Sequence, residues 1–121
     1  MNEELINNLP PDAKKEFIKY ALKLSEKKTK SKVHDDFLSF VKHVWPEFIE
    51  GKHHKEIADK FNKLAQGKIK RLIINMPPRH TKSEFASFLL PSWMVGRRPD
   101  LKIIQTTHTT ELAIRFGRKA K

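Results

Sequence analysis

The sequence predicts an α/β fold in which amino-terminal helices precede a βαβα unit of a parallel sheet. The period of the apolar residues changes after residue 67, and residues 72–74 and 101–107 are interpreted as strands. Apolar residues recur at helical spacing after each of these segments. The order strand, loop, helix, strand, helix predicts a right-handed crossover, with a ligand site at the carboxyl ends of the strands.

Residues 1–33 are expected to form an amino-terminal helix followed by a basic linker. Pro10, Pro11 and Asp12 form a typical helix start, and apolar residues then recur at helical spacing from Phe17. The pattern fades in the basic run at residues 27–32. Residues 34–121 are then expected to form the second part of the chain.

Two more helices are predicted ahead of the first strand. One spans about residues 35–44 and stops at Trp45, because a residue before proline avoids helical geometry. The other spans residues 54–66, and Gly67 is suited to cap its carboxyl end.

The first strand is predicted at residues 69–74 and buried on both faces, because the apolar run at 72–74 is continuous rather than alternating. A helix from about Lys82 is expected to be interrupted near Pro91. Turn residues at 96–100 lead to the second strand at 101–107. A last helix is expected from Thr109 to the carboxyl terminus.

Between the first strand and its helix, residues 75–84 read Asn-Met-Pro-Pro-Arg-His-Thr-Lys-Ser-Glu. A strand that enters a tight loop ending in Lys-Ser at a helix start is the layout of a phosphate-binding loop. The helix-start amides face an anion, Lys82 neutralises the β- and γ-phosphates, and the Ser83 hydroxyl holds Mg²⁺. The candidate ATP-binding residues are Pro78, Arg79, His80, Thr81, Lys82, Ser83 and Glu84.

The usual pattern of such loops would place glycines at Met76 and Thr81. Because Thr81 is β-branched, it must hold ordinary backbone angles or accept strain. The alternative is a basic loop in which Lys82 and Arg79 are simply solvated.

Composition points to a polyanionic partner. The 121 residues fit a single domain, and 25 Lys and Arg against 14 Asp and Glu give a net charge of +11. Nucleic acid is favoured over membrane, because no strongly hydrophobic amphipathic segment is present. The alternative is a basic protein without such a partner.

The sequence contains no cysteine, which excludes disulfides and thiolate metal sites and fits a reducing compartment. It also lacks a signal-peptide core and a membrane-length apolar run, so we expect a soluble, intracellular protein.

The predicted fold is incomplete. Two strands are too few for an independent parallel sheet. The sequence also lacks an apolar strand ending in Asp-Glu, which would hold Mg²⁺ and orient water, and it ends inside an apparent helix. We therefore expect residues 34–121 to form the amino-terminal part of a P-loop ATPase domain, which is the start of a P-loop NTPase fold truncated before the Walker B strand.

From Phe37 to Lys121 the chain resembles the amino-terminal ATPase region of the large subunit of tailed-bacteriophage terminases, the motors that package viral DNA. The resemblance rests on residues 67–80 with Lys82-Ser83-Glu84, on Pro91-Ser92-Trp93 with Gly96-Arg97 and Pro99-Asp100, on Arg115-Phe116-Gly117-Arg118, and on His53-His54.

The resemblance implies roles for individual residues. Lys82 and Ser83 belong to a deviant Walker A loop that binds ATP and Mg²⁺, and Arg79 is a candidate catalytic residue that stabilises phosphate charge. The implied adenine-side residues are Trp45, His53 and His54, and the implied coupling motif is Thr106, Thr107 and His108.

Each of these residues also has a plainer interpretation. Arg79 could pair with Glu84 or be solvated, and Trp45 could pack in the core. The two histidines could be solvated at a helix start, and the threonine hydroxyls could bond backbone amides there.

The resemblance also implies partners: double-stranded DNA, a small terminase subunit, the portal of the procapsid and, in the full-length form, further copies of the same protein. It implies a location in the host cytoplasm and no membrane. The parent protein would be an ATPase and endonuclease. The chain alone is expected to be inactive, because it lacks the Walker B and nuclease carboxylates.

Two other functions remain open. One is a part of another nucleic-acid-dependent P-loop ATPase, such as a helicase. The other is a small basic DNA-binding module without nucleotide chemistry, whose DNA binding would depend on salt but not on ATP.

Overall fold

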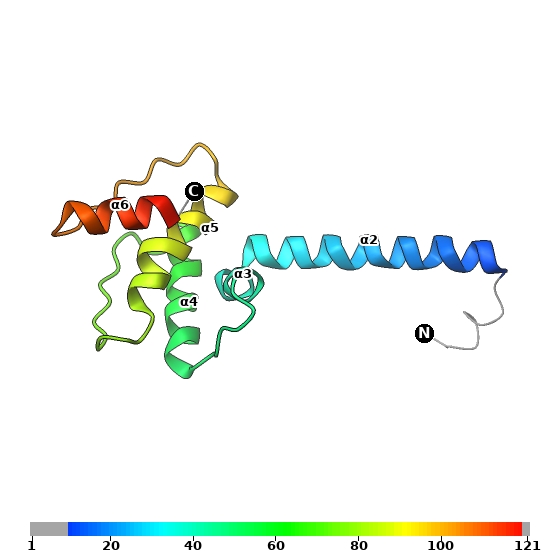
Figure 1. Ribbon diagram of the computed structural model, residues 1–121, viewed down its shortest axis with the longest axis horizontal. Coiled ribbons are helices and arrows are strands. Elements are labelled where there is room, and N and C mark those ends of the chain that lie inside the picture. Colours follow the sequence, from blue (N-terminus) through cyan, green and yellow to red (C-terminus); the bar gives the residue numbers. More distant parts are fainter. Residues whose placement is uncertain (1–9, 120–121) are drawn as a thin grey trace. The chain divides into compact units, whose positions relative to one another are not determined.

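The computed structural model describes residues 10–119, and every regular element in that range is helical (Figure 1). The chain divides into two compact units, Met1–Lys32 and Val33–Lys121, which are described separately. The elements are α2 (Pro11–Asp35), α3 (Phe37–Val44), α4 (Lys52–Ala65), η1 (Glu84–Leu89), α5 (Leu90–Arg97) and α6 (Thr110–Lys119).

Helix α2 makes up the described part of the first unit and continues into the second. It has 25 residues and buries none of them. It also runs through residues 27–32, where the sequence led us to expect a linker. That stretch contains no glycine or proline, and lysine is a good helix former, so local preference favours the longer helix. No described helix is long and apolar enough to cross a membrane.

The predicted α/β fold is wrong: between residues 10 and 119 the structure contains no strand and no sheet. The start of a P-loop NTPase fold, with its βαβα unit, is therefore not formed. Residues 71–77 and 101–107 connect helices as irregular backbone. A strand is stable only when a neighbour pairs with its backbone groups, and these two segments do not pair with each other.

Exposure along the first of these segments also differs from the prediction of burial on both faces. Leu72 and Ile74 are half-buried and pack against the helical core, whereas Ile73 between them is 87% exposed. In the second segment, Ile104 is 90% exposed. The helices thus cover one side of each segment, and no sheet covers the other.

The helices of the second unit begin and end at residues suited to those places. Asp36 caps α3, because its Oδ2 accepts hydrogen bonds from the Ser39 amide and hydroxyl at 2.8 and 2.7 Å. Helix α4 ends at Ala65, and Gly67 just beyond it has a φ of 74°, in the left-handed region that glycine tolerates. These local signals are readable in the sequence, and the helices lie close to their predicted positions.

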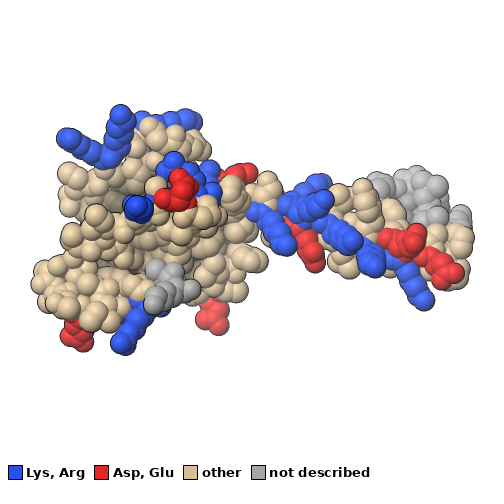
Figure 2. Space-filling view, turned by 90° about the horizontal axis from the view of Figure 1, so that it is seen from above, with Lys and Arg blue, Asp and Glu red and all other residues tan. Residues whose placement is uncertain are grey.

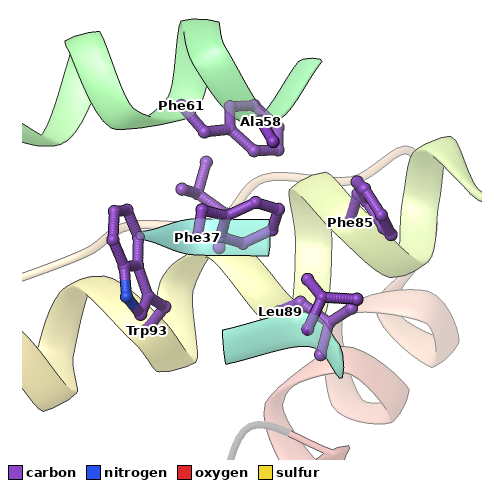
Figure 3. Close-up of a cluster of buried hydrophobic side chains, with 8 residues drawn as sticks. Phe37, Ala58, Phe61, Phe85, Leu89 and Trp93 are labelled. Atoms are coloured by element: carbon purple, nitrogen blue, oxygen red, sulfur yellow. The ribbon is translucent and has the colours of Figure 1, made fainter. Parts of the chain in front are cut away.

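The core of this unit is built around Phe37, which is fully buried (Figure 3). Its ring meets Phe61, Phe85 and Trp93 edge-on, at centroid distances of 5.0, 5.5 and 5.4 Å. The buried apolar residues are Phe37, Val41, Ala58, Phe61, Phe85, Leu89, Leu90 and Trp93. They come from α3, α4, η1 and α5, so the core joins four elements.

The helix after the loop is not broken at Pro91. Helical backbone runs from residue 82 to 97, with a π-helical stretch at η1 that ends two residues before the proline. Proline has no N–H to donate to Ser87 O, four residues earlier. The Gln105 side chain donates to that carbonyl instead, from Nε2 at 2.6 Å. The missing hydrogen bond is thus replaced from outside the helix.

Candidate phosphate-binding loop

Residues 77–84 wrap around one open pocket of about 320 Å³, and these eight consecutive residues alone line it. The loop links the segment at residues 71–77 to the helix that begins at Lys82. The candidate residues from Pro78 to Glu84 are therefore brought together, even though the predicted strand ahead of them is absent.

The backbone of the loop is strained at two places. Arg79 has a φ of 66° and Thr81 a φ of 57°, in the left-handed region that L-residues other than glycine, asparagine and aspartate seldom adopt. Of the two outcomes the sequence left open for Thr81, the structure has the strained one. Threonine thus takes a glycine-like conformation at the position where the usual loop pattern has glycine.

The loop ends at the start of a helix. The Phe85 amide donates to Thr81 O at 2.9 Å, which closes the first helical turn. The amides of Lys82, Ser83 and Glu84 stand ahead of that bond, in the turn where an α-helix has no internal acceptors for its N–H groups. Such amides, with the positive end of the helix dipole, favour an anion.

The pocket is lined by more positive than negative charge. Arg79 is exposed, Lys82 is half-buried, and neither takes part in an ion pair among residues 10–119. The one acidic lining residue, Glu84, is bound by Lys119 Nζ at 3.1 Å from both carboxylate oxygens. Glu84 is thus paired with a lysine of α6 and not with Arg79.

His54 holds the loop from the side of α4. It is only 6% exposed, and its ring lies 4.7 Å from the ring of Phe48 and 5.1 Å from that of Phe85, between centroids. Its Nδ1 accepts a hydrogen bond from the Gly51 amide at 2.9 Å, so the proton of the neutral ring lies on Nε2. That Nε2–H donates to Thr81 Oγ1 at 2.7 Å.

Electrostatics keep His54 neutral. Burial lowers the pKa of its imidazole, and the neighbouring His53 and His80 lower it further, against an opposing effect of Glu50. Glu50 itself is bound by Lys42 and Lys55. Hydrogen bonds from these two lysines lower the pKa of its carboxyl group.

The residues proposed for the adenine side have separate surroundings. The His53 ring lies 3.8 Å from that of His54 and 5.7 Å from that of His80, so it borders the loop. Trp45 is half-buried, and its ring lies 5.6 Å from that of Phe48. Trp45 thus packs on an aromatic residue at the edge of the core, while His54 is buried rather than solvated.

Thr106, Thr107 and His108 are exposed and do not line the pocket at residues 77–84. The Thr107 hydroxyl donates to Thr109 O at 2.6 Å. Thr109 caps α6, where its Oγ1 accepts from the Leu112 amide at 3.4 Å. In the structure, this threonine-rich stretch therefore organises a helix start, and it is not joined to Lys82.

No cluster of three or more His, Asp or Glu side chains suited to a metal ion was found among the described residues. Ser83, the residue predicted to hold Mg²⁺ together with the nucleotide, is exposed beside the pocket. A hydroxyl in this position would complete the coordination of an ion that the phosphates carry.

Two residues that shape the site were not singled out from the sequence. Lys119 neutralises Glu84 from 35 positions away, which no local pattern reveals. Gly51 leaves room for histidine rings, since an added Cβ would lie 2.9 Å from His53 Cε1. The only hint in the sequence was the Gly-Lys-His-His order at residues 51–54.

Comparison of the chain with protein-family models, with curated proteins and with solved structures found no match.

Proposed function

We propose that this chain binds the phosphates of ATP·Mg²⁺ at residues 77–84, as the amino-terminal part of the large subunit of a bacteriophage terminase. The proposal concerns the loop and the helix that follows it, and it does not require a sheet within this chain. Its sequence support is the Lys82-Ser83-Glu84 motif, together with the resemblance that extends from Phe37 to Lys121.

The single observation that carries the proposal is the pocket formed by eight consecutive residues at a helix start. Three amides without helical acceptors, the ammonium group of Lys82 and the guanidinium group of Arg79 belong to the same eight residues. Both cations lack an ion-pair partner among the described residues. A triphosphate offers the negative charge and the acceptor oxygens that these groups need.

Roles follow from the chemistry of each side chain. Lys82 contacts the β- and γ-phosphates, and Ser83 contributes a hydroxyl ligand to the Mg²⁺ that the nucleotide carries. Arg79 stabilises charge that develops on the γ-phosphate. Hydrolysis itself is assigned to the parent motor, because it needs a carboxylate that orients water and polarises it.

The partners proposed for the parent motor are double-stranded DNA, a small terminase subunit, the portal of the procapsid and further copies of the large subunit, all in the host cytoplasm. The net charge of +11 supports the choice of a polyanion among them.

A DNA-binding module without nucleotide chemistry is the second candidate, and helix α2 favours it. Figure 2 shows blue lysine side chains along this helix, and most of its eight lysines are exposed (Lys15, Lys19, Lys23, Lys27, Lys28, Lys30 and Lys32). This candidate predicts DNA binding that ATP does not alter.

Isothermal titration of the chain with ATP·Mg²⁺ separates the two candidates. We expect saturable binding that weakens at least about tenfold in Lys82→Ala, because a charge-assisted contact to phosphate is lost. Lys70→Ala is the matched control, since Lys70 is an exposed lysine outside the pocket, and its affinity should equal that of the parent. Absence of heat from ATP, or equal affinities for the two variants, would contradict the nucleotide function.

A further inference from the structure

Thr81 holds a conformation that its own side chain opposes. A β-branched residue with a φ of 57° brings its Cβ substituents close to the neighbouring backbone. Such conformations persist only where surrounding contacts fix them. The contact that fixes Thr81 is thus a feature on which the shape of the loop depends.

That contact is a directed chain of three hydrogen bonds. The Gly51 amide donates to His54 Nδ1 at 2.9 Å, and His54 Nε2–H donates to Thr81 Oγ1 at 2.7 Å. The Thr81 hydroxyl then donates to His80 O, also at 2.7 Å. Each donor has one acceptor, and the chain needs His54 to be neutral with its proton on Nε2.

His54 is itself held in one orientation. It is buried between the rings of Phe48 and Phe85, and it belongs to α4, an element of the core. The strained end of the loop is therefore tied to the rigid part of the second unit through one imidazole.

We propose that His54 is a positioning residue for the loop: its neutral ring, oriented by the Gly51 amide, holds Thr81 in the left-handed conformation, and protonation of Nδ1 weakens this hold because the ring loses its bond from Gly51. That this holding serves phosphate binding rests on the proposed function, whereas the holding itself does not. The role differs from the adenine contact that the resemblance implied for His54.

The groups around the ring determine in which direction the pKa of His54 is shifted. Of the charged and titratable groups that act on His54, His53 and His80 oppose its protonation, as burial does, and Glu50 favours it. The pKa of His54 consequently lies below the usual histidine value, so the ring is neutral at pH 7 and gains its proton only below that value. Protonation leaves the Nε2–H donor in place, but the new proton on Nδ1 faces the Gly51 N–H at the position of the former hydrogen bond. The two donors repel each other, so the ring turns from the orientation in which Nε2–H reaches Thr81 Oγ1.

The Phe85 amide provides a readout that needs no ligand. It donates to Thr81 O at 2.9 Å, so its hydrogen exchange increases when Thr81 leaves its place. The Trp45 amide is the reference, because it donates to Val41 O at 2.8 Å and reports on the core. The measurement is NMR-detected amide exchange, with both rates corrected for intrinsic exchange at each pH.

Two variants test the hydrogen bond from His54 to Thr81. His54→Asn leaves an acceptor near the Nδ1 position and removes the Nε2 donor. Thr81→Gly removes the backbone strain at residue 81, because glycine adopts positive φ freely. The hydrogen bond from His54 is then no longer needed to hold that conformation. The measured quantity is the opening constant of the Phe85 amide divided by that of the Trp45 amide. We expect His54→Asn to raise this ratio about fivefold in the parent background, because one neutral hydrogen bond is lost. In the Thr81→Gly background the same change should stay below about twofold.

The pH dependence is measured on the unaltered chain and on Thr81→Gly, and it needs no replacement of His54. The relative opening constant at Phe85 should rise as the pH falls from about 6.5, the ordinary histidine value, and the rise should be absent in Thr81→Gly. Equal responses in the two backgrounds, or a Phe85 amide that follows Trp45 at every pH, would overturn the inference.

Addition of ATP·Mg²⁺ distinguishes the failure of this inference from that of the proposed function. If the parent chain binds no nucleotide, the proposed function fails, while the exchange data still decide whether His54 holds Thr81. If the nucleotide binds, His54→Asn should weaken binding about fivefold in the parent background and less than about twofold in Thr81→Gly. Equal weakening in both backgrounds would assign His54 a direct contact with the ligand and refute the positioning role.

Discussion

Asp36 and Asn62 connect two helices of the second unit through a pair of opposed hydrogen bonds. Asn62 Nδ2 donates to Asp36 Oδ1 at 2.8 Å, and the Phe37 amide donates to Asn62 Oδ1 at 2.9 Å. Because Phe37 is the centre of the core, this pair places that ring between α3 and α4. The polar pair therefore fixes the position of an apolar contact.

The same pair predicts a dependence of stability on pH. Burial raises the pKa of Asp36, but hydrogen bonds from Ser39, Asn62 and the Leu38 amide together outweigh burial and lower it. A depressed carboxyl pKa contributes stability above the unfolded-state value, near pH 4, and that stability is lost as the pH falls through the folded-state value. We expect Asp36→Ala to lower the free energy of unfolding at pH 7 by about 1–3 kcal/mol. The free energy of unfolding of the variant should also fall less than that of the parent as the pH is lowered.

Urea unfolding followed by circular dichroism at several pH values tests this. The matched control is Asp59→Ala, which removes an exposed carboxylate of α4 that is paired with Lys63. Its effect should be small, because exposed ion pairs contribute little. Equal losses in the two variants would show that Asp36 is only a surface charge.

At the scale of elements, the helix that follows the loop depends on a side chain from outside it. Pro91 leaves Ser87 O without its helical donor, and Gln105 supplies one from the segment that precedes α6. This bond also anchors residues 101–107, which have no sheet partner within the described range. One hydrogen bond therefore serves both the helix and the connection.

A double-mutant cycle measures that bond. Gln105→Ala should destabilise the parent by about 1 kcal/mol, because a helical carbonyl loses its donor. In a Pro91→Ala background the loss should shrink, since the amide of the new alanine can bond Ser87 O. Unfolding free energies of the four proteins give the coupling, and additive losses would exclude this role for Gln105.

Helices were predictable from the sequence because their signals are local. Asp12, Asp36 and Gly67 lie at helix ends, and apolar residues recur every three or four positions between them. Strands depend on partners elsewhere in the chain. The run at residues 72–74 was read as a buried strand, yet Ile73 is 87% exposed because nothing pairs with the segment.

The candidate site was predictable to a similar degree. The residues of the loop are contiguous, so the Lys-Ser order after a turn-rich stretch located the pocket. The hydrogen bonds from His54 to Thr81 and from Lys119 to Glu84 join residues 27 and 35 positions apart, and they depend on how the helices pack. A threonine in the place of a glycine signalled strain at residue 81, but nothing local in the sequence indicated which side chain contacts it.

At the scale of the whole molecule, the excess of positive charge predicts how the chain meets DNA. Binding to duplex DNA should weaken steeply as salt increases, because each neutralised phosphate releases counterions. Replacing Lys23 and Lys27 of α2 with glutamine should reduce the slope of log K against log salt by about 2. Fluorescence polarisation of a labelled duplex measures the slope.

The control replaces Lys52 and Lys70, two exposed lysines of the second unit, with glutamine. An unchanged slope for the α2 variant, or an equal change in both variants, would show that α2 has no special part in DNA binding.

The most direct test of the phosphate-binding loop is a ¹H–¹⁵N NMR titration of the chain with ATP·Mg²⁺. We expect the largest shifts on the amides of His80 to Glu84, and we expect them to saturate. Lys82→Ala should need at least about tenfold more nucleotide for half-saturation, whereas Lys70→Ala should need no more than the parent. Shifts confined to the lysines of α2, or none at all, would contradict a phosphate-binding role for the loop.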